Sequence, residues 1–373
     1  MYRKAKIIYI ITLLLQLGFN TSLSADNVKN QEDSVHSTQK FDPGRMILDH
    51  VYDSYEWHIT NIGEYHITIP LPIILYSENS GWHFFSSSRF HESEDRTYFG
   101  FSVAKGGRYD GKILETTATG EFLRPWDFSI TKNVLSLFTG VLLIIFLFVS
   151  LANMYKKNYA KAPSGIQSWL EPIIIFIRDD VAKTNIGEEK YEKYLPYLLT
   201  LFFFVLINNI IGLIPFFPGG ANLTGNITVT MTLALFTFVI TIFSSNKSYW
   251  IEIINTPGVP WWLKYPVPLI PIVEIMSFFT KPFALMIRLF ANITAGHIII
   301  LGFLSIIFIF GAKSVAIGYG VSIVPFLFAI FMTLLEVLVA YIQAYVFTLL
   351  SAIYFGMSHE EHAEVEHGEI VNK

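Results

Sequence analysis

The sequence predicts an all-α membrane protein with five transmembrane helices and one interfacial helix, preceded by a small β-rich domain outside the membrane. Of its 373 residues, 52% are hydrophobic and only 15% are charged, whereas soluble domains average about 25% charged residues. Several uncharged tracts are also long enough to cross a bilayer, which takes about 20 apolar residues in a helix. The net charge of −4 gives no basic field for nucleic acid, and the absence of cysteine excludes disulfides and cysteine metal sites.

The first 25 residues have the order of a secretory signal peptide. Three cations come first, then an apolar run and then small residues: Arg3, Lys4 and Lys6; 7–15; Ser22, Ser24 and Ala25. Signal peptides share this arrangement, and the apolar run is shorter than the roughly 17 residues that a membrane anchor needs. We therefore expect residues 1–25 to be cleaved off, with an uncleaved anchor as the alternative.

Residues 26–131 have a polar and aromatic composition with clusters of turn residues. The alternating runs 65–75 and 97–104 predict strands, and Pro70 and Pro72 confine the first of them to a sheet edge. Four histidines here lack metal-ligand spacing and are interpreted as surface or packing residues: His58, His66, His83 and His91. We expect a β-rich extracytoplasmic domain without a catalytic site.

The membrane part begins with a span predicted over 133–154, where 22 residues carry no charge. Residues 166–181 place apolar side chains opposite charged ones at helical spacing, which is typical of a helix lying in the membrane interface. The next 52 residues, 195–246, carry no charge and are interrupted at Pro215 and Pro218. They predict two spans, at 194–217 and 226–244.

Two longer apolar tracts, 267–310 and 323–355, complete the predicted membrane domain, 132–358. The first has 44 residues, about 66 Å as a helix and twice the roughly 30 Å hydrocarbon core. We expect both helices to be strongly tilted, as suits helices that run obliquely across a curved partner, and to form an antiparallel hairpin about the loop 311–320.

Loop charges predict the orientation. The segments 155–193 and 245–266 hold nine Lys and Arg residues, and the opposite loops, 216–225 and 311–322, hold one. Cytoplasmic loops carry the excess of Lys and Arg. The head is therefore expected outside a bacterial inner membrane and the tail, 359–373, in the cytoplasm. Five spans fit this count, and splitting the 44-residue tract into two spans would not.

Four charged residues lie inside the last two spans: Glu274, Lys281, Arg288 and Glu336. A charge at the centre of a span costs roughly 2.5 to 3.5 kcal/mol, so each needs a partner, water or a role. The first three are spaced by seven and share one helix face. A structural ladder of ion pairs is the alternative to a functional role.

An antiparallel register of the two long helices sorts the polar residues into two levels. Arg288 falls level with Gln343, and His297 falls within two positions of the level of Glu336. The two levels are about 10 to 13 Å apart along the helix axes. A histidine beside a carboxylate can exchange protons near neutral pH. This pairing predicts a proton relay, and a buried histidine satisfied by a carbonyl or a serine is the alternative.

Three motifs closely resemble those of subunit a of F-type ATP synthases. They are 287–297 (IRLFANITAGH), 343–350 (QAYVFTLL) and 209–215 (NIIGLIP), together with Glu336 and the ending SHEEH at 358–362. The resemblance extends over about 133–362 and leaves out the head.

The resemblance implies a non-catalytic stator that abuts a rotating ring of c subunits and supplies two offset half-channels. Arg288 would face the ring and hold each arriving carboxylate ionised, with Gln343 and Asn292 lining the interface near it. His297 and Glu336 would serve the outer half-channel, and Glu274 the cytoplasmic exit. The implied partners are the c ring, b subunits, the soluble ATPase head and membrane lipid. No cofactor or metal is expected.

One departure concerns the relay, because the much-studied bacterial pattern has the imidazole and the carboxylate exchanged between positions 297 and 336. The arrangement here is closer to the mitochondrial one and keeps both groups at one level. An ion-coupled secondary transporter is the competing function, although no inverted repeat is visible and five spans do not divide into equal halves. A structural protein with a secreted head is a third class. Proton and sodium translocation are not distinguished, because the ring selects the ion.

Overall fold

The computed structural model describes residues 43–62, 65–92, 97–104, 109–117, 122–157, 162–163, 165–214, 217, 219–254 and 269–359. They form two compact units. The described residues of Tyr55–Ser129 are called the head, and those of 43–54 and 130–359 are called the membrane unit. The predicted signal peptide, 1–25, and the tail beyond His359 lie outside the described residues.

The head consists of three small antiparallel sheets, which confirms a β-rich N-terminal region. The sheets are β1-β2, β4-β3-β9 and β5-β6-β7-β8. Their strands are β1 (Glu56–Ile62), β2 (Tyr65–Pro70), β3 (Pro72–Ser77), β4 (Gly81–Ser86), β5 (Thr97–Tyr98), β6 (Phe101–Val103), β7 (Ile113–Thr116), β8 (Phe122–Leu123) and β9 (Trp126–Asp127), with a short helix α3 (Arg89–Glu92). The core is formed by Tyr55, Ile73, Leu75, Phe90, Phe101 and Ile113.

The predicted strand over 65–75 is in fact two strands in different sheets. The break falls at Leu71, whose backbone N–H donates to the Ser87 hydroxyl at 3.0 Å instead of to a ladder. Pro72 is the first residue of β3, a position at which a missing N–H is tolerated in a sheet. The edge prediction is therefore wrong for β3, which lies between β4 and β9.

The predicted strand over 97–104 is a tight hairpin. Phe99 and Gly100 have φ angles of 51° and 79°, and Tyr98 pairs with Phe101 across the turn. Two consecutive residues with positive φ are the geometry of the two-residue turns that match strand twist. The alternation of side chains continues through the turn, so the sequence pattern alone does not reveal it.

The membrane unit is helical, and five of its helices are long and apolar enough to cross a membrane. These are α4 (Lys132–Lys157), α7 (Tyr191–Leu213), α8 (Ile227–Ser244), α11 (Leu269–Gly311) and α12 (Val315–Met357). This confirms the five predicted spans. Shorter helices are α2 (Pro43–Val51), α5 (Ile166–Phe176), α6 (Thr184–Ile186) and α9 (Lys247–Ile254).

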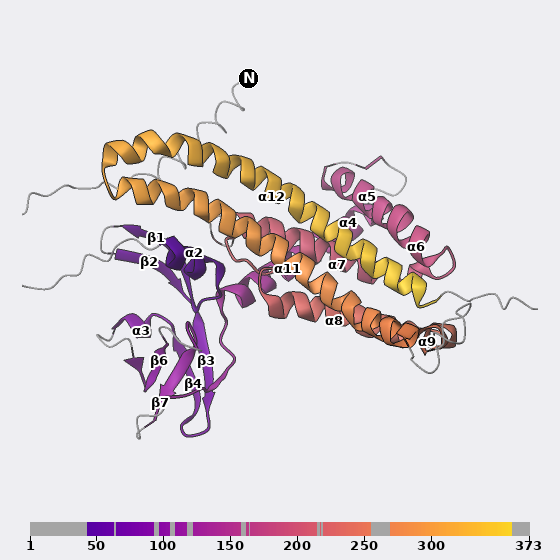
Figure 1. The fold of residues 1–373 in the computed structure, drawn as a ribbon, viewed down its shortest axis with the longest axis horizontal. Coiled ribbons are helices and arrows are strands. Elements are labelled where there is room, and N and C mark those ends of the chain that lie inside the picture. The colour runs from indigo at the N-terminus through magenta and orange to yellow at the C-terminus, as the bar shows by residue number, and fades with distance from the viewer. Residues whose placement is uncertain are drawn as a thin grey trace, which may run out of the picture. The chain divides into compact units, whose positions relative to one another are not determined.

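The helices α11 and α12 pack against each other along their length (Figure 1). A turn of three residues, 312–314, joins them, so α12 starts eight residues earlier than the predicted tract, and the expected hairpin loop over 311–320 is wrong. Gly318 explains the difference. A Cβ there would lie 2.7 Å from the Gly311 Cα, so Gly318 lies within α12 and allows its first turns to approach the end of α11 closely.

The core of the membrane unit is built around α7, which packs on α12 and α4. Its Leu198 and Phe202 are fully buried, as is Phe355 of α12. Ala340 and Ala344 are buried on the same side of α12. Small residues at these positions let helices approach closely in a membrane.

The first turn of α4 is capped by residues that precede the head in the chain. The backbone N–H of Lys132 donates to the Ser54 carbonyl at 2.9 Å, and that of Asn133 donates to the Asp53 carboxylate at 3.0 Å. The first N–H groups of a helix have no partner within it. Residues 53–54 therefore supply the cap of a helix that starts almost eighty positions later.

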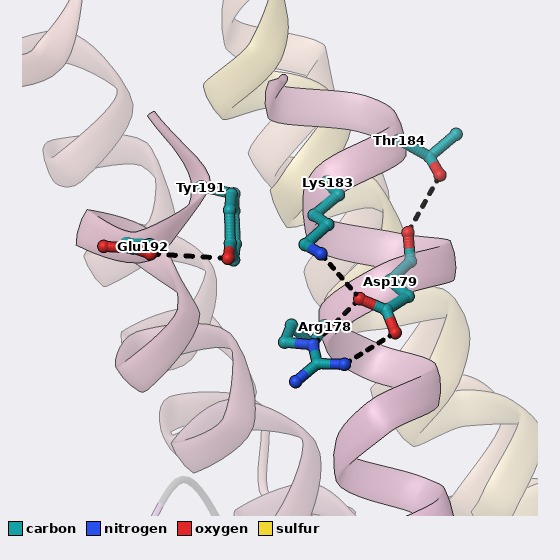
Figure 2. A network of polar contacts seen from close by, with 6 residues as sticks. All are labelled: Arg178, Asp179, Lys183, Thr184, Tyr191 and Glu192. Carbon is teal, nitrogen blue, oxygen red and sulfur yellow. Dashed lines mark hydrogen bonds and ion pairs between the residues drawn. The ribbon is translucent and has the colours of Figure 1, made fainter. Parts of the chain in front are cut away.

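The predicted amphipathic helix over 166–181 is α5 followed by a π-helical segment, η1 (Ile177–Lys183). Asp179 in η1 accepts two hydrogen bonds from Arg178, both 2.8 Å, and pairs with Lys183 at 3.1 Å (Figure 2). The Arg178 guanidinium and the Lys183 ammonium hold the pKa of Asp179 well below its usual range. The hydroxyl of Thr184 donates to the Asp179 carbonyl at 3.0 Å, which satisfies a carbonyl that wider helical winding leaves available.

Candidate functional site

The structure brings together His297 of α11 and Glu336 of α12. The His297 Nε2 lies 3.7 Å from the Glu336 Oε1, and the two side chains are 15% and 4% exposed. Gly296 makes this possible, since a Cβ there would lie 2.7 Å from the same carboxylate oxygen. The level match predicted from sequence therefore corresponds to direct proximity.

The Glu336 carboxylate is buried without a hydrogen-bond partner for either oxygen among the described residues. Burying a carboxylate without partners is costly, and buried polar groups are normally paired with protein or with water. The pair of His297 and Glu336 therefore has the properties of a site that exchanges with water or protons.

A second group of polar residues approaches the pair from α7 and the chain after it. A Cβ at Gly212 of α7 would lie 3.9 Å from the His297 Nε2 and 3.0 Å from the Ala221 carbonyl. One turn earlier, buried Asn209 accepts a hydrogen bond from buried Thr224. These buried residues were not predicted as site residues, although Asn209 stands in one of the quoted motifs.

Several polar atoms in this part of the unit are also unpartnered among the described residues. They belong to Asn209 (Nδ2), Asn222 (Nδ2), Asn208 (Oδ1) and, three residues before His297 on α11, Thr294 (Oγ1). Such atoms inside a membrane protein are compatible with stability where water reaches them. Together with Glu336 they form a buried polar region to which α7, α11, α12 and the residues after α7 contribute.

Asn208 extends this polar region toward α4. Its Oδ1 would lie 2.3 Å from a Cβ at Gly140, so glycine is required where α4 passes α7. Ser136, one turn before Gly140 on α4, is fully buried, and its hydroxyl has no partner among the described residues. In the sequence, only the presence of polar side chains within apolar spans could have indicated Asn208 and Ser136 as site residues.

Arg288 has the opposite environment. It lies near the middle of α11 and is exposed, and within the described part of the chain no carboxylate lies at ion-pair distance from it. Asn292, one turn later, is exposed as well, and exposed Ala284, Ala291 and Ala295 lie beside them. Arg288 and Asn292 therefore have small side chains directly beside them on a face that also exposes Phe283 and Ile287.

The remaining predicted residues lie apart from each other. Gln343 is buried, and among the described residues no hydrogen bond joins it to Arg288. Glu274 is half-buried near the start of α11, about 21 Å from Arg288 along the axis. Lys281 lies over the ring of Tyr354 at 5.9 Å and has no ion pair within the described ranges, so the ladder of Glu274, Lys281 and Arg288 is not formed there.

Comparison with known proteins identifies the helical part. The family model described as ATP synthase A chain matches residues 134–356. The chain belongs to this family. Curated relatives named ATP synthase subunit a include one from Chlorobium phaeobacteroides, 43% identical over 274 residues that cover 69% of this chain and 76% of the relative. Another, from Myxococcus xanthus, is 43% identical over 63% of this chain and 77% of the relative.

The head has a separate match. A family model described only as a domain of unknown function matches residues 46–128.

A relative from Chlorobaculum tepidum named ATP synthase subunit a 2 is 47% identical over 257 residues, which cover 65% of this chain and 70% of the relative. The chain is thus an integral membrane member of the ATP synthase A chain family with an N-terminal domain of unassigned role.

Proposed function

We propose that this chain is the stator subunit that carries protons past the rotating ring of c subunits in an ATP synthase, and that it performs no catalysis itself. The observation that carries the proposal is Arg288, exposed near mid-helix with no acidic partner among the described residues. An unpaired charge in a span costs roughly 2.5 to 3.5 kcal/mol on insertion scales. A partner carboxylate from outside the chain would remove this cost.

The exposed face of α11 suits a close-fitting partner helix. Ala284, Ala291 and Ala295 leave room beside the guanidinium, and small residues are what closely approaching membrane helices require. A guanidinium is always charged, so each ring carboxylate that reaches Arg288 is favoured in its ionised form. A carboxylate that must stay ionised there cannot carry its proton across, which separates the two half-channels.

The outer half-channel is assigned to His297, Glu336 and the unpartnered polar atoms near them. The support is the burial of both Glu336 oxygens without a hydrogen-bond partner among the described residues and the 3.7 Å approach of His297 to that carboxylate. Gly212 and Asn209 of α7, which contact Ala221 and Thr224 in the chain between α7 and α8, connect this pair to that segment. Gln343 and Asn292 are proposed to line the interface with the ring. Glu274, on the segment of α11 nearer its start, is proposed to serve the cytoplasmic exit.

The orientation and surroundings follow from the loop charges. We place the head, within 26–131, outside the bacterial inner membrane and the tail, 359–373, in the cytoplasm, after removal of residues 1–25. The helix α5 with η1 is proposed to lie in the cytoplasmic interface. The helices α11 and α12, each of 43 residues, are about 65 Å long and are proposed to cross the bilayer strongly tilted, as an antiparallel hairpin along the curved ring.

Purification of the whole complex tests this function against that of a secondary transporter. With an affinity tag on this chain, we expect the c ring, b subunits and the soluble ATPase head to co-purify. After reconstitution into vesicles, ATP should drive proton uptake that an ionophore abolishes. Isolation of the chain alone with substrate-dependent proton flux would contradict the proposal and favour a transporter.

A further inference from the structure

The sheet β4-β3-β9 of the head has an unusual outer face. Its inner face contributes Ile73 and Leu75 to the core. On the outer face the cross-strand neighbours are aromatic: Tyr76 pairs with Trp82 on one side and with Trp126 on the other. Phe84 pairs with Ile74 in the next row. We call the set Tyr76, Trp82, Phe84, Trp126 and Phe128 the aromatic face.

The aromatic face is exposed, and its rings pack on one another. Phe84 is 69% and Trp126 is 63% exposed. The Trp82 ring lies 5.1 Å from that of Tyr76, 6.0 Å from that of Phe84 and 5.7 Å from that of Phe128. An antiparallel sheet with one face on the core normally carries polar residues on the other. A contiguous exposed apolar patch marks a site of interaction.

Only a short stretch of chain separates this face from a membrane helix. Phe128 precedes Lys132, the first residue of α4, by four positions, a reach of at most about 14 Å. The other connection of the head is equally short, because Ser54, just before the head, accepts the 2.9 Å hydrogen bond from the Lys132 N–H. Both ends of the head are therefore fixed at the start of α4.

We propose that the aromatic face binds the lipid surface of the bilayer that α4 enters, so that the head lies on the membrane. Tryptophan and tyrosine are enriched at the membrane interface because one end of each ring is apolar and the other polar. None of the five side chains is charged. Exposed Arg124 lies two residues before Trp126, where its guanidinium can contact lipid phosphates. The short double connection favours lipid over a partner protein, since lipid surrounds the start of every membrane helix. This inference rests on α4 being a membrane helix and is independent of the ion pathway.

Spin labelling of the full chain tests this proposal, because the absence of cysteine makes any introduced cysteine unique. Phe84→Cys on the aromatic face is compared with Phe122→Cys on β8, an edge strand of the sheet β5-β6-β7-β8, where the Phe122 side chain is 66% exposed. Each protein carries a nitroxide and is reconstituted into vesicles of phosphatidylethanolamine and phosphatidylglycerol. Power saturation then measures collisions with oxygen, which concentrates in lipid, and with a water-soluble nickel chelate.

We expect oxygen to relax the label at position 84 several times more than the nickel chelate does, and the reverse at position 122. Equal, water-like values at both positions would overturn the proposal. So would protection of position 84 from both reagents, because that result means coverage by protein. If Phe84→Cys does not fold, as judged by near-ultraviolet circular dichroism, Trp126→Cys on β9 gives the same readout.

Discussion

Arg288 and His297 lie nine residues apart on one helix and have opposite surroundings. Nine residues place them about 13.5 Å apart along the axis and about 180° around it. Arg288 is exposed and has no carboxylate partner among the described residues, whereas His297 is 15% exposed and lies 3.7 Å from Glu336. One helix thus presents a charge outward on one side and holds a titratable pair inward on the other.

The difference in surroundings bears on the source of the partner that each residue binds. Glu336 is supplied by this chain, so its relation to His297 is set by packing of α11 on α12. Arg288 has no carboxylate partner among the described residues; in the proposed function its partner belongs to another molecule and can therefore change during a working cycle. Changes at Arg288 should abolish coupling, whereas changes at the inner pair should alter a rate.

The largest effect is expected for Arg288→Ala. Without the fixed guanidinium, no charge at this level favours the ionised form of an arriving carboxylate, so ATP-driven proton pumping and ATP synthesis should both fall below detection while the complex still assembles. Lys281→Ala is the matched control, since it removes a cation seven residues away on the same helix face and should leave pumping largely intact. Near-normal synthesis by the Arg288→Ala complex would contradict the role of Arg288.

An intermediate effect is expected at the inner pair. His297→Ala and Glu336→Gln should each slow proton flux through the purified membrane sector without uncoupling it. The exchange His297→Glu with Glu336→His keeps both groups at one level and should recover more flux than either single variant retains. Residues in contact show such non-additivity, typically 0.5 to 3 kcal/mol. If the double variant shows the product of the single losses, the two residues do not act as a pair.

A smaller change should perturb the pair without touching it. In Gly296→Ala the new methyl group would lie 2.7 Å from the Glu336 Oε1 and must displace that carboxylate. We expect slower flux with an unchanged or higher thermal midpoint, because alanine favours a helix over glycine by about 0.5 to 1 kcal/mol. Gly302→Ala on the same helix meets nothing within 4 Å and should keep the normal flux. Equal flux in the two variants would show that the carboxylate position is unimportant.

The smallest effect is expected at an ion pair outside the spans, where water screens charge. The lowered pKa of Asp179 means that its contribution to stability is complete above its ordinary pKa near 3.9 and is lost as pH falls toward the folded value. Asp179→Asn should lower the thermal midpoint only slightly at neutral pH, and the difference from the unmodified protein should vanish in acid. Asp180→Asn changes an adjacent exposed carboxylate without a cation at ion-pair distance among the described residues, and it should have no effect. A midpoint difference that grows in acid would contradict the assigned sign.

Local patterns in the sequence were sufficient for the spans and for one long-range contact. Uncharged length predicted all five membrane helices, and the antiparallel register placed His297 beside Glu336 because helical rise converts residue number into depth. The level match of Arg288 with Gln343 stays a prediction. Depth alone does not give orientation: Arg288 is exposed and Gln343 is buried, because helix rotation against neighbours decides which side chain turns inward.

Non-local packing explains most of the remaining differences. The start of α12 depends on contact between Gly311 and Gly318, and the division of 65–75 depends on the Ser87 hydroxyl, sixteen residues from Leu71. Asn209, Asn222 and Thr294 became candidates only once their burial without partners was known. In the head, the aromatic face could not be distinguished from a second core face by alternation alone, because alternation does not tell which side of a strand is covered.

The cap of α4 by Asp53 and Ser54 also shows how the head is inserted into the chain. The chain leaves the membrane unit at Ser54 and returns at Ile130, and the hydrogen bonds from Lys132 to Ser54 and from Asn133 to Asp53 bridge the two points. The head is thus an insertion at one loop, with its ends close enough to be joined by a few residues. Inserted domains with neighbouring ends can be gained or lost without rearranging their host. The proton pathway can therefore be inherited, and can evolve, independently of this domain.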